Sequence, residues 1–160
     1  MGVEAAMKTY ARKFGEDEES WGIIGLLHDF DYEKYPSLKD HPFKGAEILK
    51  SRNYPAQWIN IILSHASHSG IPRDTKLAKT LFAVDELCGF ITAVAYVRPN
   101  HQLAEVEVKS VKKKLKDKAF ARQVNREEIK EGAELLGLSL DEHIEVVIEA
   151  LRSVSDELGL

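Results

Sequence analysis

The chain has 160 residues, a length typical of one domain, and its 44% of apolar residues is enough for a hydrophobic core. The 22 Lys and Arg against 26 Asp and Glu give a net charge of −4, which argues against a protein dedicated to coating nucleic acid. A single cysteine excludes an intramolecular disulfide framework. No apolar run approaches the roughly 20 residues of a membrane span, and the N-terminus lacks the apolar core of a signal peptide. We therefore expect a cytoplasmic chain and not a membrane protein.

Apolar residues recur at three- and four-residue steps along almost the whole chain, which predicts a succession of helices and an all-α fold. Gly15, Pro36, Pro55, Gly70 and Pro99 mark breaks between these segments. In the first two thirds of the chain, helices are predicted over residues 3–14 and 18–27, from 41–42 onward, over 55–65 and over 76–96. Residues 28–39 show no periodicity and are predicted to form a loop.

Two capping signatures organise the C-terminal third. One begins at Asn125 and the other at Ser139, and they predict helices over residues 126–136 and 140–158, separated by Gly137. The alternating stretch at residues 104–108 is interpreted as the approach to a helix over 109–115, with a strand-like turn as the alternative. The last helix fits either a core element or a homodimer interface.

The adjacent pair His28 and Asp29 follows an apolar run, where a buried helix reaches a loop. An unpaired carboxylate is costly to bury, so this pair needs a partner. The pair either caps the helix end or binds a divalent metal. Imidazole and carboxylate together suit zinc, manganese, iron or nickel better than magnesium.

Three further residues share this kind of position. His41 begins the next predicted helix, His65 lies near the end of the following one, and Asp85 stands inside a long apolar helix. An acid in such a setting is satisfied either by an ordinary hydrogen-bond donor or by a metal. The candidate ligands are therefore His28, Asp29, His41, His65 and Asp85.

Four stretches, GLLHDFDYEKYP, HPFKGAEILK, ILSHASHSG and KTLFAVDELCGFITA, resemble in order and spacing the HD-domain superfamily of metal-dependent phosphohydrolases, in an uncharacterised HD or HDIG-type subgroup. The resemblance extends over about residues 1–96. It implies a single-domain helical bundle of roughly seven to nine helices. It also implies a metal-site core over residues 1–100 and a C-terminal helical extension over 101–160, packed on the same domain.

In this superfamily the HD pair, a distant Asp and an upstream His bind a first metal, and further His residues bind a second metal or the substrate phosphate. The resemblance assigns His28, Asp29 and Asp85 to the first group and His41 and His65 to the second. One or two ions of manganese, iron, nickel or zinc are implied.

Two departures from the family pattern matter. The upstream His would fall just ahead of Met1, and Glu4 is the oxygen ligand that could replace it. The nucleotidase branch favours a Glu three residues after the HD Asp, where this chain has Tyr32. The acids on either side of Tyr32 are Asp31 and Glu33, and either could serve instead.

The resemblance implies a phosphohydrolase that acts on a small phosphorylated metabolite or nucleotide through metal-activated water. Its candidate catalytic residues are Asp29, Asp31 or Glu33 for proton transfer, and Lys44, one turn beyond His41, for the phosphate. The alternative is a catalytically inert HD-fold module that binds a ligand or partner because its first His ligand is lacking.

The remaining features have simpler interpretations. The basic run at residues 109–122 is a solvated helix face or a cationic rim that attracts an anionic substrate. Aromatic residues do not interleave with its lysines, so a nucleic-acid polymer is not the expected partner. His101 and His143 are predicted to lie at the surface.

Overall fold

The computed structural model describes residues 1–160 and consists of helices and connecting segments without strands, which confirms the all-α prediction. No helix has both the length and the apolar composition needed to cross a membrane. The helices are α1 (Gly2–Phe14), α2 (Glu18–Leu27), α3 (Phe43–Ser51), α4 (Ala56–His65), α5 (Lys76–Tyr96), α6 (Val108–Lys116), α7 (Arg126–Leu135), α8 (Leu140–Arg152) and α9 (Ser155–Leu158), with short 3₁₀ turns at Ser67–Ser69 and Leu103–Glu105.

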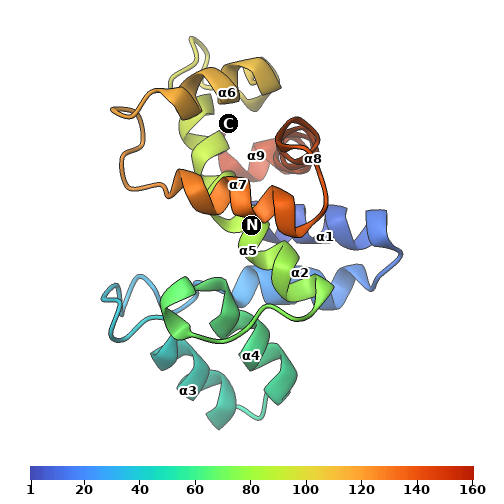
Figure 1. Ribbon diagram of the computed structural model, residues 1–160, viewed down its shortest axis with the longest axis vertical. Coiled ribbons are helices and arrows are strands. Elements are labelled where there is room, and N and C mark those ends of the chain that lie inside the picture. The colour runs from blue at the N-terminus through green and yellow to red at the C-terminus, as the bar shows by residue number, and fades with distance from the viewer.

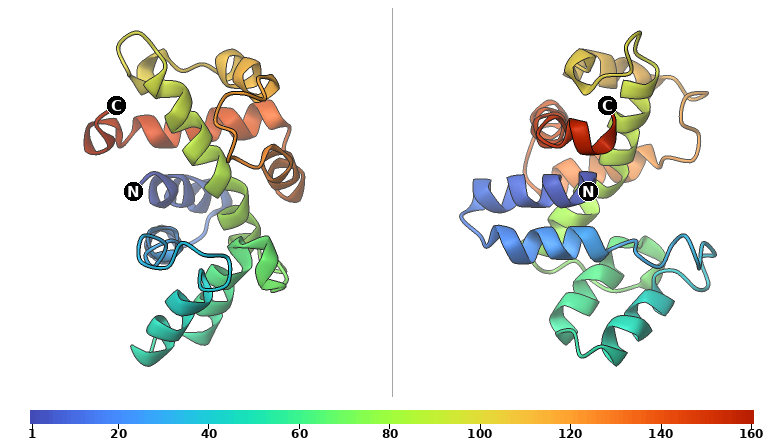
Figure 2. Two further views of the ribbon diagram at one scale, coloured as in Figure 1. Left: turned by 90° about the vertical axis from the view of Figure 1, so that its left-hand side faces the viewer. Right: turned by 180° about the vertical axis from the view of Figure 1, so that it is seen from behind.

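Helix α5 is the longest and runs through the middle of the molecule, where the other helices pack around it (Figure 1). Helices α1 and α2 form an antiparallel pair, and α3 and α4 lie beyond α2 (Figure 2). Helices α6, α7 and α8 cover the opposite end of α5. The N-terminal and C-terminal parts of the chain therefore share one central helix.

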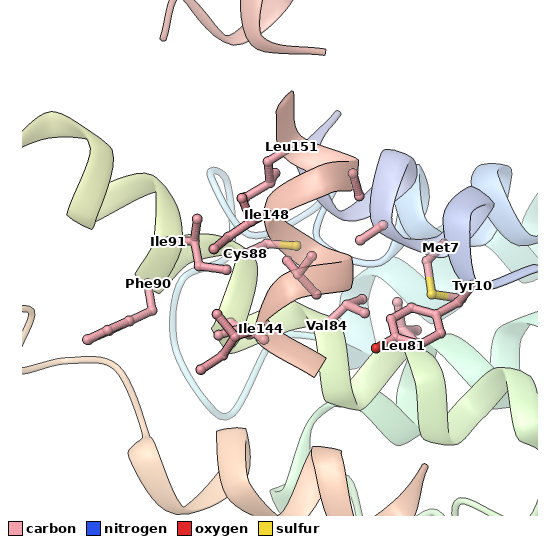
Figure 3. Packing of buried hydrophobic residues seen from close by; sticks show 14 of the residues in the cluster. Met7, Tyr10, Leu81, Val84, Cys88, Phe90, Ile91, Ile144, Ile148 and Leu151 are labelled. Carbon is pink, nitrogen blue, oxygen red and sulfur yellow. The ribbon is translucent and has the colours of Figure 1, made fainter. Parts of the chain in front are cut away.

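The core joins α1, α5 and α8 (Figure 3). Helix α5 is apolar around most of its circumference, as expected for a helix with neighbours on several sides. Its half-buried exceptions include Asp85 and Glu86, which interrupt an otherwise buried run. Fully buried members of the core are Met7, Tyr10, Leu81, Val84, Phe90, Ile91, Ile144 and Leu151.

One prediction at the C-terminal end is wrong. The helix predicted over 140–158 is broken: α8 ends at Arg152, and the chain turns at Ser153 and Val154 before α9. The guanidinium of Arg152, the last residue of α8, donates to the carbonyl of Val106 at 2.8 Å. The ambiguous stretch at 104–108 contains a 3₁₀ turn and leads into α6, without a strand.

The surface prediction for His143 is wrong, because the side chain is completely buried between α1, α5 and α8. Its Nδ1 accepts from the Tyr10 hydroxyl at 2.6 Å, and its Nε2–H donates to the carbonyl of Ala83 at 2.9 Å. Burial lowers the pKa of His143 below its ordinary 6.5, so the folded protein keeps this ring neutral. Burial likewise raises the pKa of Tyr10, which therefore stays a hydrogen-bond donor.

This buried ring predicts a pH-dependent contribution to stability. Because the folded-state pKa of His143 lies below 6.5, the unfolded chain takes up a proton first as the pH falls. The contribution is complete above about pH 6.5 and is lost as the pH falls below that value. In urea denaturation at pH 7.5, we expect the free energy of unfolding of the wild type to exceed that of H143Q by about 1–2 kcal/mol. We expect a smaller difference at pH 5.5. A difference that grows on acidification would contradict a neutral buried ring.

Candidate metal centre

The five predicted ligands, which come from four separate parts of the chain, converge in the structure. His28 and Asp29 follow the end of α2, His41 precedes α3, His65 is the last residue of α4, and Asp85 lies in the middle of α5. They form two groups, Asp29 with His41 and His65, and His28 with Asp29 and Asp85. In each group one ligand atom per residue lies within 4.8 Å of the others. Asp29 belongs to both groups.

Close contact between α1 and α2 places the first of these residues. A side chain at Gly25 would put its Cβ 2.8 Å from the side chain of Met7 and 3.1 Å from the Cα of Glu4. Gly25 lies about one turn before His28, so the close approach of the two helices there fixes the position of the C-terminal end of α2. The His28 ring then points toward α5, with Nε2 3.2 Å from Asp85 Oδ1.

The three imidazoles are oriented in the same way, with Nδ1 donating outward and Nε2 facing the middle of the cluster. The acceptors are the carbonyl of Gly25 for His28 at 2.7 Å, the carboxylate of Asp31 for His41 at 2.9 Å, and the carbonyl of Ile62 for His65 at 2.5 Å. Because a carbonyl only accepts, Nδ1 must carry the hydrogen, and this leaves a lone pair on Nε2 of each neutral ring. Metal-binding histidines are commonly held in this manner.

Two of these lone pairs face each other. His41 Nε2 and His65 Nε2 lie 3.2 Å apart, and both residues are buried. Asp29 Oδ1 lies 3.3 Å from the first nitrogen and 3.4 Å from the second. Acceptors this close repel one another unless a cation lies among them, so the arrangement fits a shared proton or a metal ion. The imidazole and carboxylate donors are those that bind divalent transition metals.

The metal-free cluster holds extra protons. Burial alone would lower the pKa of His28, but the neighbouring carboxylates of Asp85 and Asp29 outweigh it and raise the pKa to about 10. Burial would raise the pKa of Asp29, but the adjacent imidazoles of His28 and His65 hold it well below its usual range. Binding of a metal would release the proton from His28, because an imidazole ligand must be deprotonated. Metal affinity is therefore expected to weaken as the pH falls.

The two carboxylates form the open side of the cluster. The side chains of Asp29 and Asp85 are 43% and 28% exposed, whereas those of the three imidazoles are at most 9% exposed. A ligand from solvent would therefore meet the cluster from the carboxylate side.

The structure corrects the role expected for Asp31. Its side chain is only 1% exposed and uses both oxygens, so it cannot reach a substrate to transfer a proton. Oδ1 accepts from His41 Nδ1, and Oδ2 accepts from the backbone N–H of Gly45 at 2.8 Å, in the first turn of α3. A Cβ at Gly45 would lie 2.8 Å from this carboxylate, so glycine makes room for it. Asp31 therefore fixes the ring of His41 against α3.

Asp31→Asn tests this positioning role. The asparagine oxygen can accept from only one of its two donors, the His41 ring or the Gly45 N–H, and its NH₂ group faces the other. We expect the dissociation constant for Mn²⁺ to rise by about 10–100-fold, measured by calorimetry. Asp40→Asn is the matched control, because Asp40 bonds Ser37 and no candidate ligand side chain. Equal affinities in the two variants would refute the role.

Of the other predicted catalytic residues, Asp29 lies within the cluster, whereas Lys44 and Glu33 are not among its members. The ammonium of Lys44 contacts Glu47 at 2.9 Å, so the structure does not bring it to the candidate ligands. Glu33 is exposed and makes no ion pair or side-chain hydrogen bond. Glu4, considered as a substitute ligand, pairs with Lys8 at 2.6 Å.

Two residues near the cluster were not selected from the sequence. Glu86 follows Asp85 on α5, and burial together with the charge of Asp85 raises its pKa to about 7. Its position directly after Asp85, in an apolar helix, was the available signal. His68 Nε2 donates to the carbonyl of His41 at 2.9 Å and so supports the segment that carries this ligand. The spacing ILSHASHSG contained His68 but did not show what it contacts.

Comparison with known proteins gives one positive finding. A family model described as HD domain matches residues 1–89, which is more than half of the chain and includes all five candidate ligands. No curated protein gives a significant match. No solved structure does so either.

Proposed function

Because the chain belongs to the HD-domain superfamily of metal-dependent phosphohydrolases, we propose that it hydrolyses a phosphate ester of a small metabolite or nucleotide at the cluster around Asp29. The proposal assigns the metal centre to residues 1–100 and treats residues 101–160 as an extension packed on the same domain. Its proposed ligands are His28, Asp29, His41, His65 and Asp85.

The single observation that carries this proposal is the pair of facing Nε2 atoms. His41 and His65 direct these atoms at each other across 3.2 Å, with an oxygen of Asp29 beside both. A buried hydrophobic core gains nothing from such a contact, whereas a bound cation turns three repelling acceptors into ligands. The nitrogen donors favour manganese, iron, nickel or zinc over magnesium.

When bound, a divalent ion would supply Lewis acidity, which lowers the pKa of water so that hydroxide is available near neutral pH to attack phosphorus. The ion's charge would also offset the negative charge on the phosphate oxygens. The chain's own residues prepare this chemistry. The three imidazoles direct Nε2 toward the middle of the cluster because each Nδ1 hydrogen is engaged elsewhere, and His28 would lose its Nε2 proton when the ion binds. Asp29 reaches both halves of the cluster from its solvent side. Glu33, exposed and unpaired, is the proposed proton carrier in place of Asp31.

The test begins with protein purified without chelator or metal-affinity resin. We expect near-stoichiometric transition metal by elemental analysis, and phosphate release from p-nitrophenyl phosphate or a nucleoside monophosphate that stops on chelation and returns with Mn²⁺. Bound metal without hydrolysis of any phosphoester in a broad panel would favour a ligand-binding module. Failure to bind manganese, nickel or zinc after soaking would refute the metal centre itself.

A further inference from the structure

The connection between α6 and α7, residues 117–125, is called the 117–125 loop here. It lies on the same side of the molecule as the segment that follows α2 and carries Asp29 (Figure 1). The left panel of Figure 2 shows the two segments facing the viewer on either side of α5. The loop contains the C-terminal part of the basic run, which the proposed function has not used.

One side chain holds this loop in shape. The guanidinium of Arg126, the first residue of α7, donates to five backbone carbonyls around it, those of Leu115, Asp117, Phe120, Ala121 and Val124. The Phe120 ring also packs edge-on against Phe90 of α5, with ring centroids 5.5 Å apart. Because the backbone is fixed on the inside, the exposed side chains of the loop start from defined positions.

The exposed side chains of this loop include unpaired cations. Lys118 and Arg122 are both exposed, and neither has a carboxylate within 4.0 Å nor makes a side-chain hydrogen bond. The one acid of the loop, Asp117, accepts from the backbone N–H of Ala119 at 3.0 Å. The loop therefore presents two positive charges that no group in the molecule neutralises.

The far end of the loop is tied to the edge of the metal centre. The backbone N–H of Asn125 donates to Glu86 Oε2 at 3.3 Å, and Glu86 follows the candidate ligand Asp85. In the next turn, Glu128 accepts from the hydroxyl of Ser67 at 2.8 Å, just beyond α4 and its ligand His65. These contacts join both sides of the centre to the first turn of α7.

The open side of the centre is acidic, since Asp29 and Asp85 form it and Glu86 adjoins it. A phosphate group carries negative charge, so cations near this acidic side would favour its approach. Lys44 is already paired with Glu47. We propose that the 117–125 loop is the phosphate-binding wall of the metal centre, with Arg122 as the principal contact and Lys118 as the second. This inference rests on the proposed function and adds the residues that recognise its substrate.

Inorganic phosphate is the probe, titrated calorimetrically into manganese-loaded full-length protein. We expect Arg122→Gln to raise the dissociation constant by about tenfold, and R122Q with K118Q to raise it further, because a hydrogen bond between charged groups is lost each time. The double variant K109Q with K113Q is the matched control. It removes the same charge from exposed positions on α6, and neither lysine is ion-paired. We expect the control to change the constant less than about twofold, because distant surface charges are screened.

The outcomes separate the two proposals. Manganese content is measured in every variant, and it should stay unchanged because neither cation is a candidate ligand. Equal weakening by the loop pair and the α6 pair would show that only overall charge matters and would overturn the loop's role. Wild-type affinity in the loop variants would overturn it as well. A wild-type protein that binds no manganese, or binds manganese but not phosphate, would overturn the proposed function together with this inference.

Discussion

Asp29→Ala will remove metal from both halves of the centre and leave the helices folded. Asp29 is the only residue shared by the two ligand groups, so its loss leaves each group with two of its three residues. Removing an outer residue that orients a ligand costs about 10–100-fold in affinity, and loss of a direct carboxylate ligand should exceed about 100-fold. The measurement is metal content by elemental analysis after dialysis, alongside the circular dichroism of the helices.

The control for this experiment is Asp156→Ala, which removes an exposed carboxylate from the short helix α9, away from the cluster. It should retain the wild-type metal content. The helical signal should survive in both variants, because the Asp29 side chain is 43% exposed and contributes nothing to the apolar core. Metal retained by Asp29→Ala at the wild-type ratio would mean that the ion is held elsewhere.

The helices could be predicted because their signals are local. The Asn125 side chain caps α7 by accepting from the N–H groups of Glu127 and Glu128, and Ser139 and Glu142 form the reciprocal capping box of α8. Such contacts span three residues and are visible in the sequence. The break between α8 and α9 was missed because Ser153 and Val154 are compatible with a helix, and the contacts of Arg152 with the carbonyls of Leu103 and Val106 are not visible in the sequence.

The predicted ligands also carried a local signal, since each is a polar residue at a helix end or within an apolar run. Their partners did not. Asp31 lies in a loop without periodicity, and its role depends on Gly45, fourteen residues away. His143 occupies a position on the apolar face of α8, but its hydrogen-bond partner Tyr10 is 133 residues distant. The burial of a histidine in such a position is predicted wrongly when only its residue type is considered.

Arg126 shows the same limit on prediction. In the sequence it is one more cation beside a basic run, at the first position of a capped helix. Only the folded chain shows that its guanidinium donates hydrogen bonds to backbone carbonyls of the segment before α7. The basic run therefore divides into two parts with different surroundings, the lysines on α6 and the cations of the 117–125 loop.

Gly132→Ala will destabilise the fold strongly, because Gly132 is where α7 crosses α5 with no space for a side chain. A Cβ at this position would lie 2.6 Å from the Cα of Ala83 and 2.9 Å from its Cβ. The obstructing atoms belong to the backbone and to a methyl group, so no rotamer change relieves the contact and α7 must move. We expect a loss of about 2–3 kcal/mol in the free energy of unfolding, measured by urea denaturation.

The matched control is Gly89→Ala, on an exposed face of α5, where the added Cβ would meet no atom of another element within 4 Å. It should stabilise the protein by about 0.5–1 kcal/mol, because alanine favours a helix interior over glycine. The displacement of α7 in Gly132→Ala should also strain the contacts from Asn125 to Glu86 and from Ser67 to Glu128. Phosphate binding should then weaken while the five candidate ligands stay in place. If the two glycine variants were equally stable, α7 would not be packed on α5 as the structure places it, and the loop would lose its anchor.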